Sequence, residues 1–311
     1  VIARVEKHPK IKVLKNAELK TAVGSVGSFV SEVRVDGEER AVTYGVAVVA
    51  TGGKESRPEE YLYGEDPRVM THLEFDAAMR DNPGLLGKTQ SVVFIQCVGS
   101  RDERRPYCSR VCCTHSVKAA IALKKLNSQM NIYVLNRDIR TYGEREDLYR
   151  QARDLGVIFI RYDVDRKPVA RRQGDDIAVE VFDPILQMPV SIAADHLVLA
   201  AAIEPNVTQD LVELYKCAAN ADGFLNEAHP NLRPEDMAVD GLFVAGLCNY
   251  PKPLNETIAQ AKAAAARAAT ILSQTEMTLD AIKSFVTDQC DGCALCLDVC
   301  LYRAIKLEEV Q

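Results

Sequence analysis

The stretch from Val92 to Leu126 constrains the fold of this chain more than any other part. It begins with the apolar run Val92–Ile95, which is typical of a buried parallel strand, and apolar residues recur at helical spacing from Ser116 onward. A strand, a connection and a helix in this order predict one unit of an α/β domain. In a dinucleotide-binding unit the connection would be a tight glycine-rich turn that places a pyrophosphate on the helix N-terminus, and Gln96–Ser100 lacks that glycine pattern.

The connection instead carries four cysteines, which we call the strand–helix cysteines: Cys97, Cys108, Cys112 and Cys113. The macrodipole and free N–H groups at a helix N-terminus favour thiolates and negative charge, so an iron–sulfur cluster is the natural candidate ligand. Adjacent helical residues diverge by about 100°, so we expect Cys112 and Cys113 in a non-helical turn before the helix. Two alternatives stay open: some of the four are ordinary buried cysteines, or Cys112 and Cys113 form a thiol redox pair.

A second group, which we call the C-terminal cysteines, has the spacing C-x2-C-x2-C-x3-C: Cys290, Cys293, Cys296 and Cys300. This spacing is typical of bacterial ferredoxins, in which three close thiolates bind one cubane and the fourth reaches another cluster. Structural zinc is the competing interpretation. Leu301 replaces the usual proline, and no second cysteine run follows before Gln311. We therefore expect the missing fourth ligand outside this sequence, and Cys300 would serve a cluster whose other ligands are absent.

Length and composition limit the function classes. A chain of 311 residues has room for about two domains. A net charge of −6 gives no reason to expect nucleic-acid binding, and no apolar run is long enough to span a membrane. Ten cysteines at ligand-like spacings indicate metal binding in a reducing cytoplasm. The chain begins at Val1 without a glycine fingerprint, so we interpret it as a fragment that lacks its N-terminal part.

Two further strands end at small residues, where a ligand could approach the backbone closely. Ala41–Val49 leads to Thr51, Gly52 and Gly53, and Leu242–Ala245 leads to Gly246. Plain structural turns explain both equally well. The remaining predicted elements are a helix at Val1–Lys7, strands at Ile11–Leu14, Phe29–Val35, Ile132–Leu135, Val157–Ile160, Ile177–Phe182, Val190–Ala193 and His196–Ala202, and helices at Arg145–Leu155 and from Asn255, a plausible N-cap.

A basic stretch follows the second strand of the cysteine unit and contains Arg137, Arg140, Arg145 and Arg150. Such charges are mostly solvated surface. A surface for an acidic partner, or for the anionic cluster itself, is the functional alternative. Residues 54–90 are polar and rich in proline and glycine, so we interpret them as a connector.

Five segments together carry a family resemblance: QCVGSR with YCSRVCC, IYVLNRDIRTYG, LGVIFIRYD, GLFVAGLCNYPK and CDGCALCLDVC. In this combination and order the chain resembles the flavin- and iron–sulfur-containing subunit of heterodisulfide reductase and its relatives in anaerobes. The resemblance implies an α/β, two-lobed FAD/NAD(P)-type disulfide-reductase fold with doubly wound sheets, similar to thioredoxin reductase, and a C-terminal ferredoxin-like piece.

Mapped onto this chain, the resemblance implies four parts. Residues 1–83 would be a truncated first piece of an FAD-binding domain, 84–200 an inserted pyridine-nucleotide-type domain that carries the strand–helix cysteines, 201–275 the second FAD piece, and 276–311 a partial ferredoxin module. The strand–helix cysteines would bind a [4Fe–4S] cluster in place of a nicotinamide nucleotide.

The resemblance also places the flavin. The family's flavin motifs fall on Thr51 and Gly52 and on Gly246, Leu247 and Cys248, where Leu247 replaces the aspartate of disulfide reductases. Lys252 is the candidate for a cation near the redox edge of the flavin, with a solvent-exposed loop lysine as the alternative. The residues expected near the isoalloxazine ring are Asn255, Glu256 and Thr257.

The function that the resemblance implies is electron transfer between FAD and [4Fe–4S] clusters in an oxidoreductase complex, with disulfide reduction on a partner protein. Expected partners are other subunits of a heterodisulfide-reductase-like complex, and ferredoxin, hydrogenase or dehydrogenase-type electron donors, with a homodimer possible. Two alternatives are an NAD(P)H-dependent disulfide oxidoreductase that uses Cys112 and Cys113, and a non-catalytic docking protein.

Overall fold

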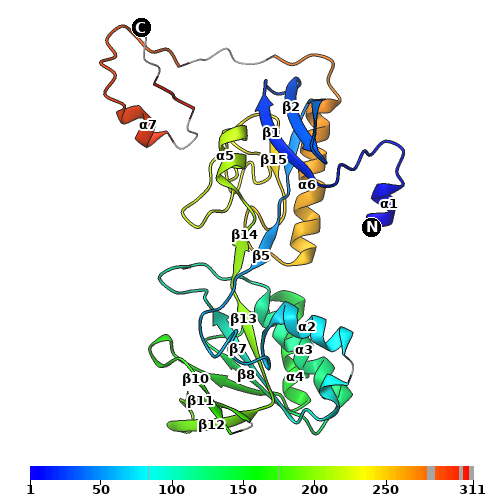
Figure 1. Cartoon of the computed structure of the whole chain (residues 1–311), viewed down its shortest axis with the longest axis vertical. Coiled ribbons are helices and arrows are strands. Elements are labelled where there is room, and N and C mark those ends of the chain that lie inside the picture. Colours follow the sequence, from blue (N-terminus) through cyan, green and yellow to red (C-terminus); the bar gives the residue numbers. More distant parts are fainter. Residues whose placement is uncertain (83, 175, 279–283, 301–303, 308–311) are drawn as a thin grey trace. The chain divides into compact units, whose positions relative to one another are not determined.

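The computed structural model describes all residues except 83, 175, 279–283, 301–303 and 308–311. The chain divides into two compact units (Figure 1). Unit 1 comprises residues 1–53, 205–250 and 254–311, and unit 2 comprises residues 54–204 and 251–253. Residues 54–82, which were expected to belong to the first FAD piece, lie in unit 2. Among the described residues, no helix is both long and apolar enough to cross a lipid bilayer.

Unit 2 is built on a five-stranded parallel sheet with the order β6-β13-β7-β8-β9. Successive side chains of each strand point to opposite faces of the sheet, and both faces are buried. This explains why the strands appear in the sequence as continuous apolar runs. The strands are β6 (Val69–Thr71), β7 (Ser91–Val98), β8 (Asn131–Asn136), β9 (Ile158–Arg161) and β13 (His196–Ala201).

Helices cover one face of this sheet and a small antiparallel sheet covers the other (Figure 1). On β7, Val92 and Phe94 pack toward the helices, whereas Val93 and Ile95 pack toward the small sheet. The helices are α2 (His72–Asp81), α3 (Cys112–Leu126) and α4 (Glu146–Asp154), and the sheet consists of β10 (Val169–Gln173), β11 (Asp176–Asp183) and β12 (Met188–Ala194).

Unit 1 contains an antiparallel three-stranded sheet, β1-β2-β3, and a parallel pair, β15-β4. Its largest apolar cluster joins residues of both sheets to Cys217 and Cys248. The elements are α1 (Ile2–Glu6), β1 (Ala17–Val23), β2 (Phe29–Val35), β3 (Glu38–Tyr44), β4 (Ala47–Val49), α5 (Gln209–Tyr215), β15 (Leu242–Val244), α6 (Leu254–Leu272) and α7 (Leu295–Val299). At the boundaries of the units, β5 (Gly53–Glu55) pairs with β14 (Ile203–Pro205).

Several local predictions were wrong. Ile11–Leu14 is not a strand: Ile11 donates its N–H to the carbonyl of His8 at 3.0 Å, and its side chain stays exposed. The run Ala41–Val49 forms two strands, because β3 pairs antiparallel with β2 while β4 pairs parallel with β15.

One predicted helix start also needs correction, and one helix was missed. The helix expected from an Asn255 N-cap begins at Leu254, so Asn255 lies in its first turn. The supposed connector contains α2, which starts with a complete capping box between Thr71 and Glu74. That T-x-x-E pattern was the available sequence signal.

Candidate metal centre

The strand–helix cysteines lie at the carboxyl edge of the parallel sheet in unit 2. Cys97 is near the end of β7, and α3 begins at Cys112. After β7 the chain adds β8 and β9 on one side of this strand, and it later adds β13 on the other side. The carboxyl end of β7 is therefore the point where the order of strands in the sheet reverses. Open α/β sheets bind ligands at this kind of position.

Cys97 has an unusual backbone conformation. Its φ angle is +60°, in the left-handed region that residues with a side chain rarely adopt. The register between β7 and β13 shifts here, so that Gln96 and Cys97 together face Ala200. A bulge of this kind redirects a side chain, and such backbone strain occurs preferentially at functional sites.

Cys112 and Cys113 occupy the first turn of α3, which contradicts the prediction that they precede the helix. Their divergence around the helix axis matters less at this end, because side chains of a helix tilt toward its N-terminus. Both thiols can therefore reach a site in front of the N-terminus of α3. Their side chains also form a hydrogen bond with each other.

The loop between Cys97 and Cys112 is fixed by hydrogen bonds. The Tyr107 hydroxyl donates to the carbonyl of Ile203 at 2.8 Å, and the N–H of Ile203 donates to the hydroxyl of Ser109 at 3.0 Å. The N–H of Arg110, which also has a left-handed φ of +60°, donates to the sulfur of Cys108 at 3.3 Å. The fold thus holds Cys108, which is partly exposed, beside the start of α3.

The four thiols lie close enough to influence one another's ionisation. Burial, and then the neighbouring Cys113, raise the pKa of Cys97 to about 11. The hydrogen bond with Cys113, together with burial, raises the pKa of Cys112 well above its usual value, and Cys97 and Cys108 add to this. The same hydrogen bond lowers the pKa of Cys113 to about 7. The structure therefore brings together all four residues of the predicted set.

Positive charge surrounds this site. The guanidinium of Arg101 lies 3.8 Å from the sulfur of Cys97 and also pairs with Asp138, which Arg140 contacts at 3.2 Å. Burial alone would raise the pKa of Asp138, but Arg101 and Arg140 outweigh burial and lower it. The sulfur of Cys113 is 3.9 Å from the carbonyl oxygen of Asp138.

The predicted basic stretch divides into two parts. Arg137 donates to the carbonyl of Arg101 at 2.6 Å, so Arg137 and Arg140 belong to the cysteine site. Arg145 instead lies over the ring of Tyr142, and Arg150 forms an exposed pair with Asp147. The first two support the cluster interpretation and the last two the surface interpretation.

The donor set fits an iron–sulfur cluster. The part of the chain that the structure describes holds no group of three or more His, Cys, Asp or Glu side chains that could bind a single metal ion. A cubane makes a different demand, because each ligand sulfur binds a separate iron and the ligands stand farther apart. Four free thiols, nearby guanidinium groups and a helix N-terminus satisfy that demand chemically.

Some predicted flavin residues lie together in unit 1. β4 and β15 are parallel neighbours, so the residues that follow them, Thr51 and Gly52 after β4 and Gly246 after β15, lie at the same edge. Gly246 has a φ of +85°, donates its N–H to Gln260 at 2.8 Å and lies close to Thr257 on α6. Thr51 is exposed, and Gly52 has a φ of +78°.

The remaining flavin candidates differ in exposure. Leu247 and Glu256 are partly buried, and Asn255 is exposed. Cys248 is fully buried, and its thiol lies 3.5 Å from the carbonyl oxygen of Val49, so it contributes to the core of unit 1. Lys252 is buried rather than solvent-exposed, and it lies in residues 251–253, which belong to unit 2.

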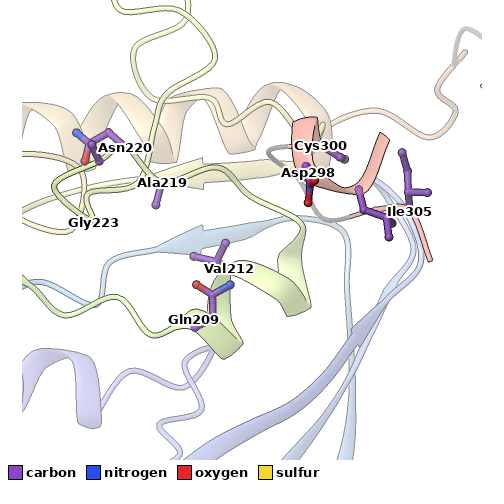
Figure 2. A pocket seen from close by; sticks show the side chains of 10 residues that line it. Gln209, Val212, Ala219, Asn220, Gly223, Asp298, Cys300 and Ile305 are labelled. Carbon is purple, nitrogen blue, oxygen red and sulfur yellow. The ribbon is translucent and has the colours of Figure 1, made fainter. Parts of the chain in front are cut away.

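The C-terminal cysteines are less enclosed. Cys290, Cys293 and Cys296 are exposed and Cys300 is partly buried. Figure 2 shows Cys300 in a pocket of unit 1, together with Asp298 and Ile305 and with residues of and after α5, among them Gln209, Val212 and Asn220. None of the predicted flavin residues lines this pocket. The departure at Leu301 lies outside the described residues.

Sequence reasoning missed the polar residues that surround the strand–helix cysteines. Arg101, Asp138 and Gln96 lie inside the segments that carry the family resemblance, and that was the only available signal. Ser116 and His72 had none, because a serine in a helix and a histidine in a presumed connector are both ordinary.

Comparisons with known proteins confirm the resemblance. The chain is 36% identical over 266 residues to a CoB–CoM heterodisulfide reductase iron-sulfur subunit of Methanopyrus kandleri; the match covers 81% of this chain and 40% of that protein. It is 35% identical over 297 residues to the corresponding subunit of the H2/formate:CoB–CoM heterodisulfide,ferredoxin reductase of Methanococcus maripaludis, covering 88% of this chain and 44% of that protein. The chain thus spans less than half the length of these relatives. No family model matches it.

Solved structures confirm the fold class. Thioredoxin reductase from T. acidophilum matches with a TM-score of 0.51 and 14% identity, over 82% of this chain and 72% of that one. An NAD-dependent persulfide reductase from A. fulgidus matches with a TM-score of 0.52 and 17% identity, over 89% of this chain and 48% of that one. At such identities the likeness establishes the FAD/NAD(P) disulfide-reductase fold and nothing finer.

Proposed function

From a chain that is similar over 88% of its length to one of the subunits of heterodisulfide reductases, we propose an electron-transfer role in an oxidoreductase complex. The strand–helix cysteines hold a [4Fe–4S] cluster, and unit 1 contributes to an FAD site. When bound, these groups supply single-electron and two-electron redox chemistry, respectively. A disulfide is reduced on a partner protein of the complex.

One observation carries this proposal: the four thiols lie at the sheet edge where a nucleotide-binding domain of this fold would hold phosphates. Arg101 and Arg140 supply positive charge that stabilises an anionic cluster, and the surrounding burial raises the electrostatic weight of that charge. Asp138 keeps Arg101 in place through their ion pair. These residues orient ligands and set the local potential.

Exchange of Cys112 for serine tests the proposal. After anaerobic reconstitution, the iron content of Cys112→Ser should fall by about four irons per chain, with a matching loss of visible absorbance. Cys217→Ser is the matched control, because Cys217 is equally buried but lies in unit 1. Unchanged iron and absorbance in Cys112→Ser would remove Cys112 from the ligand set.

The flavin site is proposed on two grounds. Thr51, Gly52 and Gly246 follow the parallel strands β4 and β15 at the same edge, and Thr257 lies close to Gly246. The family resemblance adds the neighbouring residues Leu247, Cys248, Asn255 and Glu256. Lys252, a buried cation, is proposed to stabilise reduced flavin. Flavin quantification in wild-type protein and in Gly246→Val tests the site, since a side chain at a φ of +85° should displace the turn.

We also propose that the partners are other subunits of a heterodisulfide-reductase-like complex, a ferredoxin, or hydrogenase- or dehydrogenase-type donors. The names of the relatives support this, because each describes one component of a multi-subunit enzyme. The C-terminal cysteines would serve this exchange as a ferredoxin-like piece. Anaerobic affinity purification from the native source, with mass spectrometry of the retained proteins, tests it.

One observation favours a second candidate, a thiol-based disulfide oxidoreductase. The thiols of Cys112 and Cys113 are joined by a hydrogen bond, as expected of a redox pair. That candidate predicts flavin reduction by NAD(P)H in iron-free protein and loss of this reaction in Cys113→Ser. Iron-dependent spectra without NAD(P)H oxidation would reject it.

A further inference from the structure

A buried chain of hydrogen bonds lies directly behind the strand–helix cysteines. The side-chain amide of Gln96 donates to the hydroxyl of Ser116 at 2.5 Å, and that hydroxyl is 2.7 Å from Nε2 of His72. Gln96 and Ser116 are completely buried, and His72 is 5% exposed. Burial lowers the pKa of His72 well below its usual value, so the ring is neutral and Nε2 can accept the Ser116 proton.

This chain connects three elements at the positions that matter for the cysteines. Gln96 is next to Cys97 on β7, Ser116 is one helical turn after Cys112 on α3, and His72 is the first residue of α2. A fourth segment is attached by a hydrogen bond to the backbone of Gln96: the Tyr162 hydroxyl donates to the carbonyl oxygen of Gln96 at 2.6 Å. Gln96 is therefore held through both its side chain and its backbone.

The network is not optimised for stability alone. Oε1 of Gln96 is buried and has no hydrogen-bond partner in the part of the chain that the structure describes. A buried acceptor without a partner is costly, and an apolar side chain of the same length would avoid that cost. What Gln96 provides in return is a fixed link between the strand end and α3, immediately before the strained residue Cys97.

His72 extends the chain toward the surface. Its ring stacks on His115 with 4.4 Å between the ring centres, and Nε2 of His115 lies 3.0 Å from a carboxylate oxygen of Asp76 on α2. This stacked pair joins α2 to the first turns of α3, on the helix-covered side of the sheet (Figure 1). The start of α3 is thus held by Gln96 of β7, which bonds to Ser116, and by His72 of α2, which stacks on His115.

We propose that Gln96, Ser116 and His72 are positioning residues for the cysteine site. Their hydrogen bonds fix Cys97 in its left-handed conformation against the first turn of α3, so that the ligand geometry exists before iron is bound. This inference rests on the proposed function for its effect on a cluster. Residues that orient metal ligands from behind tune affinity and potential, although they touch no metal.

The first test uses the iron-free 311-residue chain and measures alkylation of Cys97 by iodoacetamide with peptide mass spectrometry. Loss of a buried hydrogen bond in Ser116→Ala or Gln96→Met should speed the reaction of Cys97, relative to Cys108, by about three- to tenfold. Cys108 is the internal reference, because general unfolding would accelerate both. Ser91→Ala is the matched control: Ser91 lies at the other end of β7, and its buried hydroxyl has no partner among the described residues.

A double-mutant cycle separates a shared device from two independent packing defects. If Gln96 and Ser116 act together, the double variant should react no faster than the faster single variant. In reconstituted protein, the same variants should shift the midpoint potential of the reduced cluster's EPR signal, and Ser91→Ala should not.

The proposal is overturned if both single variants react at the wild-type rate, or if their effects multiply in the double variant. A wild-type chain that takes up no iron would refute the proposed function. The alkylation measurements would still decide whether the network positions Cys97.

Discussion

The two groups of cysteines have the same ligand chemistry on different supports. Each strand–helix cysteine lies on or beside β7 or α3, which pack closely together in unit 2, and two of the four are buried. Three of the C-terminal cysteines are exposed, and the helix among them, α7, has no buried residue. In the first group the fold supplies the geometry, whereas in the second the spacing along the sequence supplies it.

The difference teaches where each group must obtain its order. The strand–helix cysteines are arranged by contacts within the protein itself: hydrogen bonds, a bulge and a helix start. For the C-terminal cysteines we expect the order to come from the proposed metal binding itself, because metal binding and folding are coupled in small metal sites. The following predictions test this contrast, in order of expected effect.

Serine substitutions, one in each group of cysteines, should affect the stability of the metal-free protein differently. Cys112→Ser and Cys293→Ser should each lower the iron content, because each removes one of the proposed thiolate ligands. In metal-free protein, however, Cys112→Ser should lower the thermal unfolding midpoint by about 2–4 °C, since it places a hydroxyl in a buried site. Cys293→Ser should leave that midpoint unchanged. Equal midpoints for both variants in calorimetry would contradict the contrast.

Phenylalanine truncations compare the two supports without metal. Phe94→Ala removes a completely buried ring from β7 and should cost about 3–5 kcal/mol of unfolding free energy. Phe285→Ala removes a side chain that is 85% exposed and should change the same quantity by less than about 0.5 kcal/mol. Urea titrations followed by circular dichroism measure both. A large effect of Phe285→Ala would show that the C-terminal segment is packed in metal-free protein, and would contradict the contrast.

The stability of unit 2 should also depend on pH through Asp66. Its carboxylate accepts hydrogen bonds from Arg68 at 2.9 and 3.0 Å and pairs with Arg172, and the Arg68 bonds lower its pKa strongly. A lowered folded-state pKa means that this stabilisation is complete above the unfolded value of about 3.9 and is lost as pH falls toward the folded value.

Asp66→Asn should therefore cost about 1–3 kcal/mol at pH 7, and the difference from wild type should shrink below about pH 4. Asp288→Asn, in the exposed C-terminal segment, is the control and should show no pH-dependent change. A constant difference for Asp66→Asn from pH 7 to pH 3 would mean that packing, rather than charge, accounts for its effect.

Strongly patterned regions were predictable from sequence. Val92–Ile95 is a buried strand because both faces of the sheet are covered, and this leaves a continuous apolar run that local composition reveals. The sequence also indicated that the strand–helix cysteines lie together, because four thiols occur within one strand–helix connection, and the structure brings them close to one another. The fold class followed from the alternation of strands and helices and from the family resemblance.

Other features depend on contacts between distant residues. The helix at His72–Asp81 is decided by its capping box and by Phe75, which packs against the sheet, and proline and glycine nearby concealed it. The break between β3 and β4 reflects two different partner strands. The hydrogen bonds of Ser116 to Gln96 and His72 join residues 20 and 44 positions apart, and no local pattern encodes them.

The order of strands in unit 2 has a consequence for how the protein is made. β13 lies between β6 and β7, although it is the last of the three to leave the ribosome. At about 5–20 residues per second, the gap left for β13 stays open for on the order of ten seconds after β7 has been synthesised. Throughout that interval Cys97 has no opposing strand to form its bulge. Assembly of the proposed cluster at these cysteines is therefore expected to follow synthesis of β13.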